Sequence, residues 1–226
     1  MSQTTSGVTP VLLVVDDDPS VRRSLARLLR SAGYAVETFA SASELLAREP
    51  LSTPGCLILD VRLPGLSGLD LQAMLRAAGT EKATIFVSGL GDVPTSVRAM
   101  KEGAVDFLTK PIDDTQLLEA VERALAHDRA AREESAELSE LRRRLASLTP
   151  REREVCALVA TGRLNKQIAF LLGTSEKTIK VHRARVMTKM QTTSVAALVR
   201  AVDRIGLGPR ARVSDGSTRE RTSEAR

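Results

Sequence analysis

Four short apolar runs in the first half of the chain each lead into residues that can act on phosphate or metal. These residues are, in chain order, the acids Asp16, Asp17 and Asp18, the acid Asp60, the hydroxyl of Ser88 and the amine of Lys110. Helical patterns separate the runs, which predicts parallel strands of one sheet. Because ligands of open α/β sheets bind beyond the carboxyl ends of the strands, we expect these side chains to meet in one place.

The charges of these residues indicate the chemistry of that place. Carboxylates packed together repel one another and favour a hard divalent cation, and Mg²⁺ takes oxygen ligands, several waters and a phosphate. Lys110 adds a positive charge and Ser88 a hydroxyl for phosphate oxygens. Asp60 ends a central strand and faces the acidic pair. It is therefore the candidate nucleophile, and its product would be an aspartyl phosphate.

Composition and charge limit the class of protein. The chain has 226 residues, 42% of them apolar, which suits one large or two ordinary domains. Cys56 and Cys156 each lie in an apolar pattern, which predicts buried, reduced thiols. The sequence contains no signal peptide and no apolar run of membrane-spanning length, so we expect a cytoplasmic protein without a membrane partner.

Charge is distributed unevenly along the chain. Residues 1–126 carry 12 basic and 16 acidic residues, a net charge of −4, whereas residues 149–208 carry 11 and 4, a net charge of +7. The acidic N-terminal segment suits control by metal or phosphate, and the basic C-terminal segment favours a polyanion as partner.

Apolar periodicity predicts an α/β domain, a doubly wound parallel (βα)5 sheet over residues 11–126, after an N-terminal extension at 1–10. Its strands are expected at 11–15, 35–39, 56–60, 83–88 and 105–108, and its helices at 19–31, 41–48, 67–78, 92–102 and from 115 onward. Asp92 is a plausible N-cap of the fourth helix. A charged helix without Gly or Pro follows over 127–148. Its Leu138 and Leu145 have the seven-residue spacing of a coiled coil, but a solvated linker helix remains an alternative.

The sequence after Thr149-Pro150 predicts an all-α domain over residues 149–207 and a disordered tail at 208–226. Its helices are expected at 151–161, 166–172, 176–190 and 194–205. The short turn between the second and third contains Gly173, as in a helix-turn-helix. On the third helix Lys180 suits phosphates and guanine edges, while Val181 and Ala184 suit close approach to thymine methyls. A solvated charged face is the alternative, which the charge of this segment disfavours.

The first half resembles the receiver domain of bacterial response regulators over about residues 8–126. The matching motifs are Val15-Asp16-Asp17-Asp18, Leu59-Asp60-Val61-Arg62-Leu63-Pro64-Gly65, Val87-Ser88-Gly89 and Phe107-Leu108-Thr109-Lys110-Pro111. The resemblance implies that Asp16, Asp17, Asp60 and the backbone carbonyl of Arg62 bind Mg²⁺. It implies that Asp60 is the phosphoacceptor, Ser88 the switch hydroxyl and Lys110 the phosphate-binding lysine, with a cis bond before Pro111. We expect Phe107 to be the switch aromatic, and Asp18 stays unassigned.

The second half resembles the LuxR-type helix-turn-helix over about residues 144–206. The matching segments are Leu148 through Val155, Asn165 through Ala169 and Ser175 through Arg183. Both halves together are similar to the FixJ/NarL group. This implies a transcription regulator, not an enzyme, whose partners are a sensor histidine kinase, a second copy after phosphorylation, promoter DNA and RNA polymerase. The expected DNA contacts are Asn165, Lys166, Lys177, Thr178, Lys180, Val181, Arg183, Ala184 and Lys189.

Two other functions remain as alternatives. An Asp-based phosphohydrolase would use the same groups, but it needs a further general acid–base and a substrate cap, and the loops are short. A regulator whose receiver only dimerises would not need the full set of acids, hydroxyl and lysine. The two histidines, His127 and His182, are too far apart in the sequence to favour a metal site or a triad. We expect His127 to be exposed, and His182 to pack or to touch phosphate.

Overall fold

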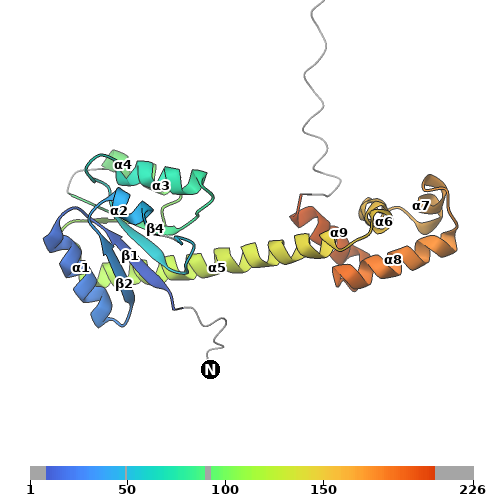
Figure 1. Ribbon diagram of the computed structural model, residues 1–226, viewed down its shortest axis with the longest axis horizontal. Helices are drawn as coiled ribbons and strands as arrows, with labels where there is room; N and C mark the ends of the chain where they lie inside the picture. The colour runs from blue at the N-terminus through green and yellow to red at the C-terminus, as the bar shows by residue number, and fades with distance from the viewer. Residues whose placement is uncertain (1–8, 49, 90–92, 207–226) are drawn as a thin grey trace, which may run out of the picture. The chain divides into compact units, whose positions relative to one another are not determined.

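A computed structural model of the chain describes residues 9–48, 50–89 and 93–206 (Figure 1). The chain forms two compact units that divide between Arg132 and Glu133. The predicted cap at Asp92 and the predicted disordered tail lie outside the described residues. Within the described ranges, no helix is both long and apolar enough to cross a membrane.

The N-terminal unit contains a five-stranded parallel sheet with the strand order β2-β1-β3-β4-β5. The strands are β1 (Val11–Val15), β2 (Ala35–Phe39), β3 (Cys56–Asp60), β4 (Ala83–Ser88) and β5 (Asp106–Thr109). The first four have the predicted bounds, and β5 begins one residue later than predicted. The strand order reverses between β1 and β3, so the carboxyl ends of these two strands flank the switch point where α/β sheets bind ligands.

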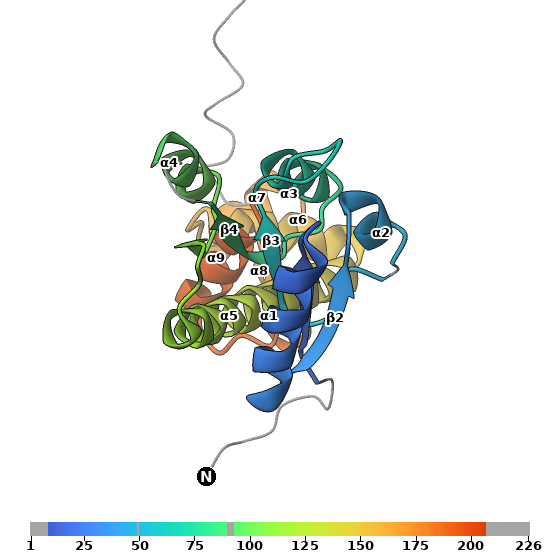
Figure 2. The ribbon, with the colours of Figure 1, turned by 90° about the vertical axis from the view of Figure 1, so that its left-hand side faces the viewer.

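Helices cover both faces of this sheet, as the predicted doubly wound fold requires (Figure 2). One face packs against α1 (Pro19–Ser31) and α5 (Asp114–Ala146), and the other against α2 (Ala42–Leu46), α3 (Gly68–Ala77) and α4 (Val93–Lys101). Neighbouring strand residues serve opposite faces, since Leu12 belongs to the first core and Leu13 to the second. Cys56 lies in the first core, and burial raises the pKa of its thiol to about 12.

The predicted fifth helix and the predicted linker helix are one continuous helix, α5, of 33 residues. Its part up to Arg132 belongs to the N-terminal unit. There, the Asp128 carboxylate accepts a hydrogen bond from Gly55 N–H at 3.0 Å, and Arg132 donates to the Thr53 carbonyl at 2.7 Å. Both bonds attach α5 to the loop that enters β3. No Gly or Pro interrupts this stretch, so the helix continues past the core it covers.

The C-terminal unit contains the end of α5 and four further helices. These are α6 (Pro150–Ala160), α7 (Asn165–Leu171), α8 (Glu176–Met190) and α9 (Val195–Arg204). Their shared core includes Val155, Ile168 and Val186, and Leu145, one of the leucines with seven-residue spacing, packs against it. Ser175 caps α8 by accepting a hydrogen bond from Thr178 N–H at 3.1 Å. The turn before this cap contains Gly173, with a φ of 59°, and completes a helix-turn-helix formed by α7 and α8.

Candidate phosphoacceptor site and nucleic-acid interface

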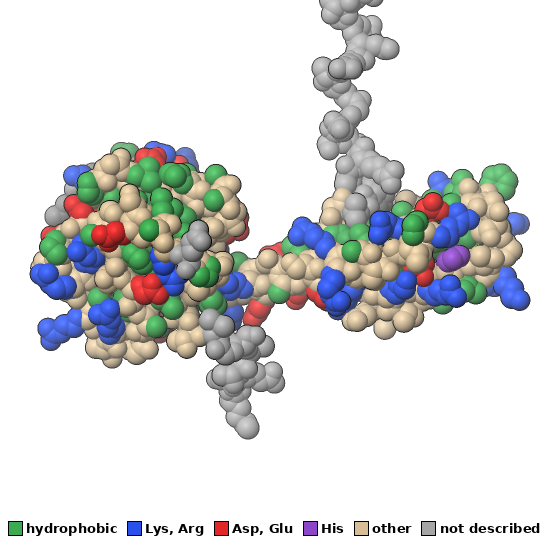
Figure 3. Space-filling view, in the orientation of Figure 1, with side chains coloured by type: hydrophobic (Ala, Val, Ile, Leu, Met, Phe, Trp, Pro, Cys, Tyr) green, Lys and Arg blue, Asp and Glu red, His purple; other side chains and the backbone are tan. Residues whose placement is uncertain are grey.

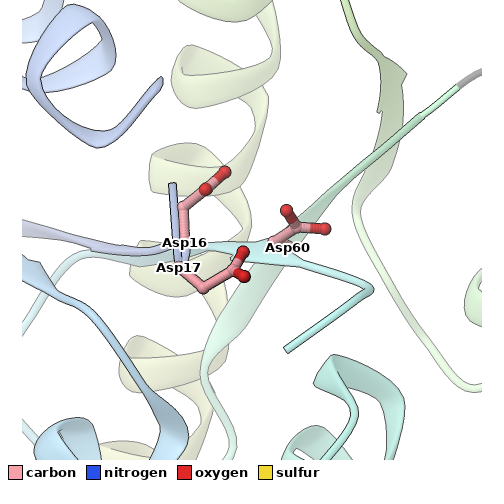
Figure 4. A group of neighbouring side chains, drawn as sticks. All are labelled: Asp16, Asp17 and Asp60. Carbon is pink, nitrogen blue, oxygen red and sulfur yellow. The ribbon is translucent and has the colours of Figure 1, made fainter. Parts of the chain in front are cut away.

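Three carboxylates meet at the carboxyl edge of the sheet, as the sequence predicted. Ligand oxygens of Asp16, Asp17 and Asp60 all lie within 4.8 Å of one another. Asp16 and Asp17 follow β1, and Asp60 ends the neighbouring strand β3 (Figure 4). Asp16 and Asp60 are buried, whereas Asp17 is exposed and opens the cluster to solvent. Such a compact set of hard oxygen ligands is compatible with Mg²⁺.

Lys110 joins the two buried acids of this cluster. Its Nζ donates to Asp16 Oδ2 at 2.7 Å and to Asp60 Oδ2 at 2.5 Å. Its backbone N–H donates to the Ser88 carbonyl at 2.7 Å, and the bond to Pro111 is cis, as the resemblance implied. Burial raises the pKa of Asp16, although the Lys110 ammonium opposes the shift. Burial would lower the pKa of Lys110, but the hydrogen bonds to both carboxylates leave it above its usual value.

The second oxygen of each buried acid is fixed by the backbone. Asp60 Oδ1 accepts the N–H of Arg62 at 2.9 Å, and Asp16 Oδ1 accepts the N–H of Asp18 at 2.9 Å. Each carboxylate is therefore oriented, with one oxygen on the chain and the other on Lys110. A group that binds at Asp60 Oδ2 meets the ammonium directly.

Three residues support the cluster in ways that the sequence did not reveal. Asp18 caps α1, since its Oδ1 accepts the N–H of Ser20 at 2.7 Å. Arg22, on the first turns of α1, donates to the backbone carbonyl of Asp16 at 2.5 Å. A Cβ at Gly68 would lie 2.3 Å from the Asp60 carbonyl oxygen, so only glycine allows α3 to begin there. The Asp18-Pro19 pair is a typical helix start and could have indicated the cap.

Ser88 ends β4, one residue past the partner of Asp60 in the sheet register. Its side chain is fully buried, and among the described residues its Oγ has no hydrogen-bond partner. Phe107 pairs with Phe86 across β4 and β5 and packs, partly buried, against the core that contains Phe86. The structure thus places the predicted switch hydroxyl beside the acidic cluster and the predicted aromatic on the next strand.

Most of the predicted DNA contacts form an exposed face on the helix-turn-helix. The exposed residues are Lys166 on α7 and Lys177, Thr178, Lys180, Val181 and Ala184 on α8. Val181, an apolar side chain, is 45% exposed. In the view of Figure 3, Lys and Arg side chains are spread over the C-terminal unit.

Four of the predicted DNA contacts have partners within the unit. The Thr178 hydroxyl is hydrogen-bonded to the Ser175 hydroxyl at 2.8 Å. Arg183 donates to Asn165 Oδ1 at 3.0 Å, which joins α8 to the start of α7. Lys189 Nζ donates to Glu152 Oε2 at 2.6 Å and to the Ser147 carbonyl at 3.2 Å. The Lys189 ammonium and the backbone N–H of Thr149 lower the pKa of Glu152 to about 2. The sequence did not predict this structural role of Lys189, and its contact with phosphate stays a prediction.

The histidines form no common site. His127 is exposed, as expected. His182 is half-buried on α8, and its Nδ1 is buried without a hydrogen-bond partner among the described residues.

Comparison with known proteins decides the family. Residues 12–122 match the response regulator receiver domain, and residues 146–202 match the luxR family of bacterial regulatory proteins. Nodulation protein W of Bradyrhizobium diazoefficiens is 47% identical over 204 residues, which are 90% of each chain. The transcriptional regulatory protein FixJ of Azorhizobium caulinodans is 46% identical over 197 residues, which are 87% of this chain and 93% of that relative. The chain belongs to the response regulators.

Solved structures of other response regulators share the same architecture. The response regulator StyR aligns with a TM-score of 0.76 and 44% identity over 87% of this chain and 100% of that chain. Full-length FixJ from B. japonicum aligns with a TM-score of 0.54 and 42% identity over 88% of this chain and 98% of that chain. The predicted fold, a receiver followed by a helical LuxR-type domain, is confirmed.

As a response regulator with a LuxR-type domain, the protein is a phosphorylation-controlled transcription regulator and not an enzyme. The alternative of a phosphohydrolase is thereby excluded. The receiver implies a kinase as phosphodonor, and the LuxR-type domain implies DNA as partner. The acids that converge beside β1 and β3 are compatible with Mg²⁺.

Proposed function

We propose that Asp60 of this response regulator accepts a phosphoryl group from a sensor histidine kinase. The observation that carries the proposal is the position of Lys110, whose Nζ lies 2.5 Å from Asp60 Oδ2 and 2.7 Å from Asp16 Oδ2. A carboxylate oxygen of Asp60 forms the bond to phosphorus while the bond to the donor imidazole nitrogen breaks. The Lys110 ammonium is already positioned beside Asp60, so it stabilises the negative oxygens of the transferred group.

Four oxygen ligands would hold the metal in this site. These are carboxylate oxygens of Asp16, Asp17 and Asp60 and the backbone carbonyl of Arg62. When bound, Mg²⁺ offsets the repulsion between the carboxylates and the phosphoryl oxygens. The Arg62 N–H keeps the Asp60 carboxylate in a fixed orientation by its hydrogen bond to Oδ1.

The buried Ser88 hydroxyl supports a switch. A buried hydroxyl without a partner costs free energy, and a phosphoryl oxygen on Asp60 would supply an acceptor for it. Ser88 then moves inward, and Phe107 turns into the vacated space. The surface of α4 and β5 changes and pairs with a second receiver. The coupling between phosphorylation and pairing should be about 1–3 kcal/mol.

We propose that the resulting homodimer binds promoter DNA in the cytoplasm and acts there with RNA polymerase. Lys180, Val181 and Ala184 read bases from α8, and Lys166 and Lys177 contact phosphates. The exposure of all five side chains supports this assignment. A dimer on DNA requires two half-sites about one helical turn apart.

Replacing Asp60 by Asn tests the phosphoacceptor. The amide has nearly the same shape but is not a nucleophile, so Asp60→Asn should keep the fold and lose phosphoryl acceptance. The measurement is the intact mass after incubation with Mg²⁺ and acetyl phosphate. Asp114→Asn, an exposed acid in the first turn of α5, is the matched control and should be phosphorylated like the wild type. A phosphate adduct on Asp60→Asn at the wild-type level would refute the assignment.

A further inference from the structure

A cavity of about 220 Å³ lies in the N-terminal unit at the amino edge of the sheet. Its walls come from one face of α3, the loop that enters β4, the turn after α4, and α5. We call it the amino-edge cavity and define it by Gln72, Arg76, Lys82, Gly103 and His127. β4 begins next to the cavity and ends at the switch hydroxyl, so the cavity is separate from the acidic cluster at the carboxyl edge.

The amide of Gln72 has an unused hydrogen-bond acceptor in the wall of this cavity. The side chain is 7% exposed, and Oε1 is buried without a hydrogen-bond partner in the described part of the chain. The hydroxyl of the neighbouring wall residue Thr84 cannot serve, because it donates to the Lys82 carbonyl at 2.9 Å. A buried acceptor without a donor costs free energy. A hydroxyl or amino group that enters the cavity would supply the missing donor.

Arg76 brings an unpaired cation to the same wall. It follows Gln72 by four residues and therefore lies on the same face of α3. Its Nη2 donates to the backbone carbonyl of Glu102, and a Cβ at Gly103 would lie 2.6 Å from Nη2, so the glycine leaves room for the guanidinium. The Glu102 carboxylate pairs instead with Arg98 at 2.7 Å, and no other carboxylate in the ranges that the structure describes pairs with Arg76. The remaining guanidinium donors suit a carboxylate.

Lys82 is a second cation whose charge no carboxylate pairs with in these ranges. Its Nζ donates to the backbone carbonyls of Thr53 at 2.5 Å and Leu51 at 3.4 Å, and burial lowers its pKa to about 8. Asp128, the buried acid in the wall, is already held by hydrogen bonds of 3.0 and 2.8 Å from other groups. An anion in the cavity would therefore meet positive charge that lacks a partner.

We propose that the amino-edge cavity binds a small carboxylic acid that also carries a hydroxyl or amino group. The carboxylate binds the Arg76 guanidinium, the hydroxyl or amino group donates to Gln72 Oε1, and the apolar part of the ligand packs on Leu75, a buried leucine of the wall. A water molecule takes up about 30 Å³, so the cavity holds the bulk of about seven waters. A single ring with two substituents is of this size. The proposed phosphoacceptor function does not depend on this site.

A titration of the full-length, ¹⁵N-labelled protein with 2-, 3- and 4-hydroxybenzoate tests the site by NMR. The ring matches the apolar wall, and the three isomers present hydroxyl and carboxylate at three different spacings. We expect at least one isomer to bind with a dissociation constant below about 1 mM. The shifted backbone amides should be those of Gln72, Arg76 and Gly103. Benzoate lacks the donor and phenol lacks the carboxylate, so each should bind at least about fivefold more weakly.

The titration contradicts the proposal in two cases. In the first, none of the three isomers causes saturable shifts, which means that the cavity holds only water. In the second, the saturable shifts lie at the acidic cluster or on α8 instead of around the cavity.

Substitutions assign the two contacts separately. Gln72→Leu removes the amide at similar size and should reduce the affinity for the binding isomer to that of benzoate. Arg76→Met removes the charge and should reduce it to that of phenol. Gln116→Leu on α5 and Arg27→Met on α1 replace exposed residues outside the cavity and should bind like the wild type. If Gln72→Leu or Arg76→Met binds the isomer as tightly as the wild type, the proposal is wrong.

Two further measurements keep the outcome unambiguous. Thermal unfolding shows whether each variant is folded, and Arg76→Met, which changes an exposed side chain, provides the test even if Gln72→Leu does not fold. Both folded variants should still accept a phosphoryl group from acetyl phosphate, as measured by intact mass. If the wild type binds an isomer but accepts no phosphoryl group, only the proposed function fails. If it is phosphorylated and binds none of the isomers, only the cavity proposal fails.

Discussion

At the scale of single residues, the helix-turn-helix uses lysines for two different purposes. Lys180 is exposed on α8, whereas Lys189, nine residues later, is turned to the opposite side of the helix. Lys189 there forms an ion pair with Glu152, whose side chain is only 4% exposed. One lysine is available to a ligand, and the other holds α8 to the start of α6.

The ion pair between Lys189 and Glu152 makes the stability of the C-terminal unit depend on pH. The folded pKa of Glu152, about 2, lies below the ordinary value of 4.5. The pair therefore stabilises the fold above pH 4.5, and this contribution is lost as pH falls from 4.5 towards 2. Lys189→Met should lower the free energy of unfolding at neutral pH by about 1–3 kcal/mol and flatten its acid dependence. Denaturant unfolding followed by circular dichroism at several pH values measures both effects.

The control for this variant is Lys177→Met, which removes an exposed lysine from the same helix. The free energy of unfolding of Lys177→Met should decrease at acid pH in the same way as that of the wild type. If the free energy of unfolding of both variants changes between pH 2 and 4.5 as it does in the wild type, the pKa of Glu152 does not depend on Lys189.

The exposed lysine is expected to act on DNA. Lys180→Ala should weaken binding to a specific site by about 1–3 kcal/mol and relax the preference at one position of each half-site. Lys177 is proposed as a phosphate contact, so Lys177→Ala should weaken binding to all DNA sequences alike. The slope of log affinity against log salt concentration should fall by about one unit. Affinities for matched and scrambled sites at several salt concentrations distinguish the two. Equal losses of specific and non-specific binding in Lys180→Ala would mean that it contacts only phosphate.

Residue-level prediction from sequence succeeded where side chains follow strand ends. Asp16, Asp60 and Lys110 meet because parallel strands bring their carboxyl ends to one edge, and periodicity reveals the strands. The partner of Lys189 could not be predicted, because Glu152 lies 37 positions away on another helix. Its burial depends on how α6 and α8 pack, and helical periodicity contains no such information.

At the scale of elements, α5 is fixed to the receiver beyond the region that covers the sheet. Asp128 is buried and accepts hydrogen bonds from Gly55 N–H and from Arg132 Nε at 3.0 and 2.8 Å. Arg132 and Lys82 both donate to the Thr53 carbonyl, at 2.7 and 2.5 Å. The sequence predicted a receiver that ends at residue 126, followed by a charged linker helix. It could not reveal polar anchors that involve a distant loop.

Removing the buried carboxylate should loosen this end of the receiver. Asp128→Ala leaves the Gly55 N–H without its acceptor and should cost about 1–3 kcal/mol in stability. Amide hydrogen exchange over residues 124–132 should become faster, while exchange in β3 and β4 changes less. The exposed residue Glu122, on the same helix, serves as the control in Glu122→Ala. Exchange that stays at the wild-type rate in Asp128→Ala would show that the helix needs no such anchor.

At the scale of the whole molecule, the chain combines an acidic receiver with a basic DNA-binding unit. The opposite net charges of the two segments, −4 and +7, were evident from the sequence and match the families of the two halves. Two copies are expected to pair through α4, where Val97 and Met100 are 49% and 48% exposed. Apolar side chains at this level of exposure suit a surface that becomes covered on pairing.

Introducing a charge on α4 tests this pairing. Met100→Glu should prevent dimerisation in the presence of a phosphate mimic, because an unpaired carboxylate would be buried in the new interface. Phosphoryl acceptance at Asp60 should be retained, since the substitution lies outside the acidic cluster. Sedimentation with and without the mimic measures the dimer constant, and Met74→Glu on α3 is the matched control. If Met100→Glu dimerises with the wild-type constant, the dimer interface does not include this face of α4.

The ring of Phe170 on α7, which is 87% exposed, has an optical consequence. The chain contains no tryptophan, and its single tyrosine, Tyr34, lies in the N-terminal unit. The C-terminal unit is therefore almost silent in near-ultraviolet absorbance and fluorescence. Phe170→Trp would place the molecule's one indole on the outside of α7, where its emission depends directly on contact with water. A single aromatic exchange thus turns a spectroscopically dark unit into one whose surface contacts can be followed in real time.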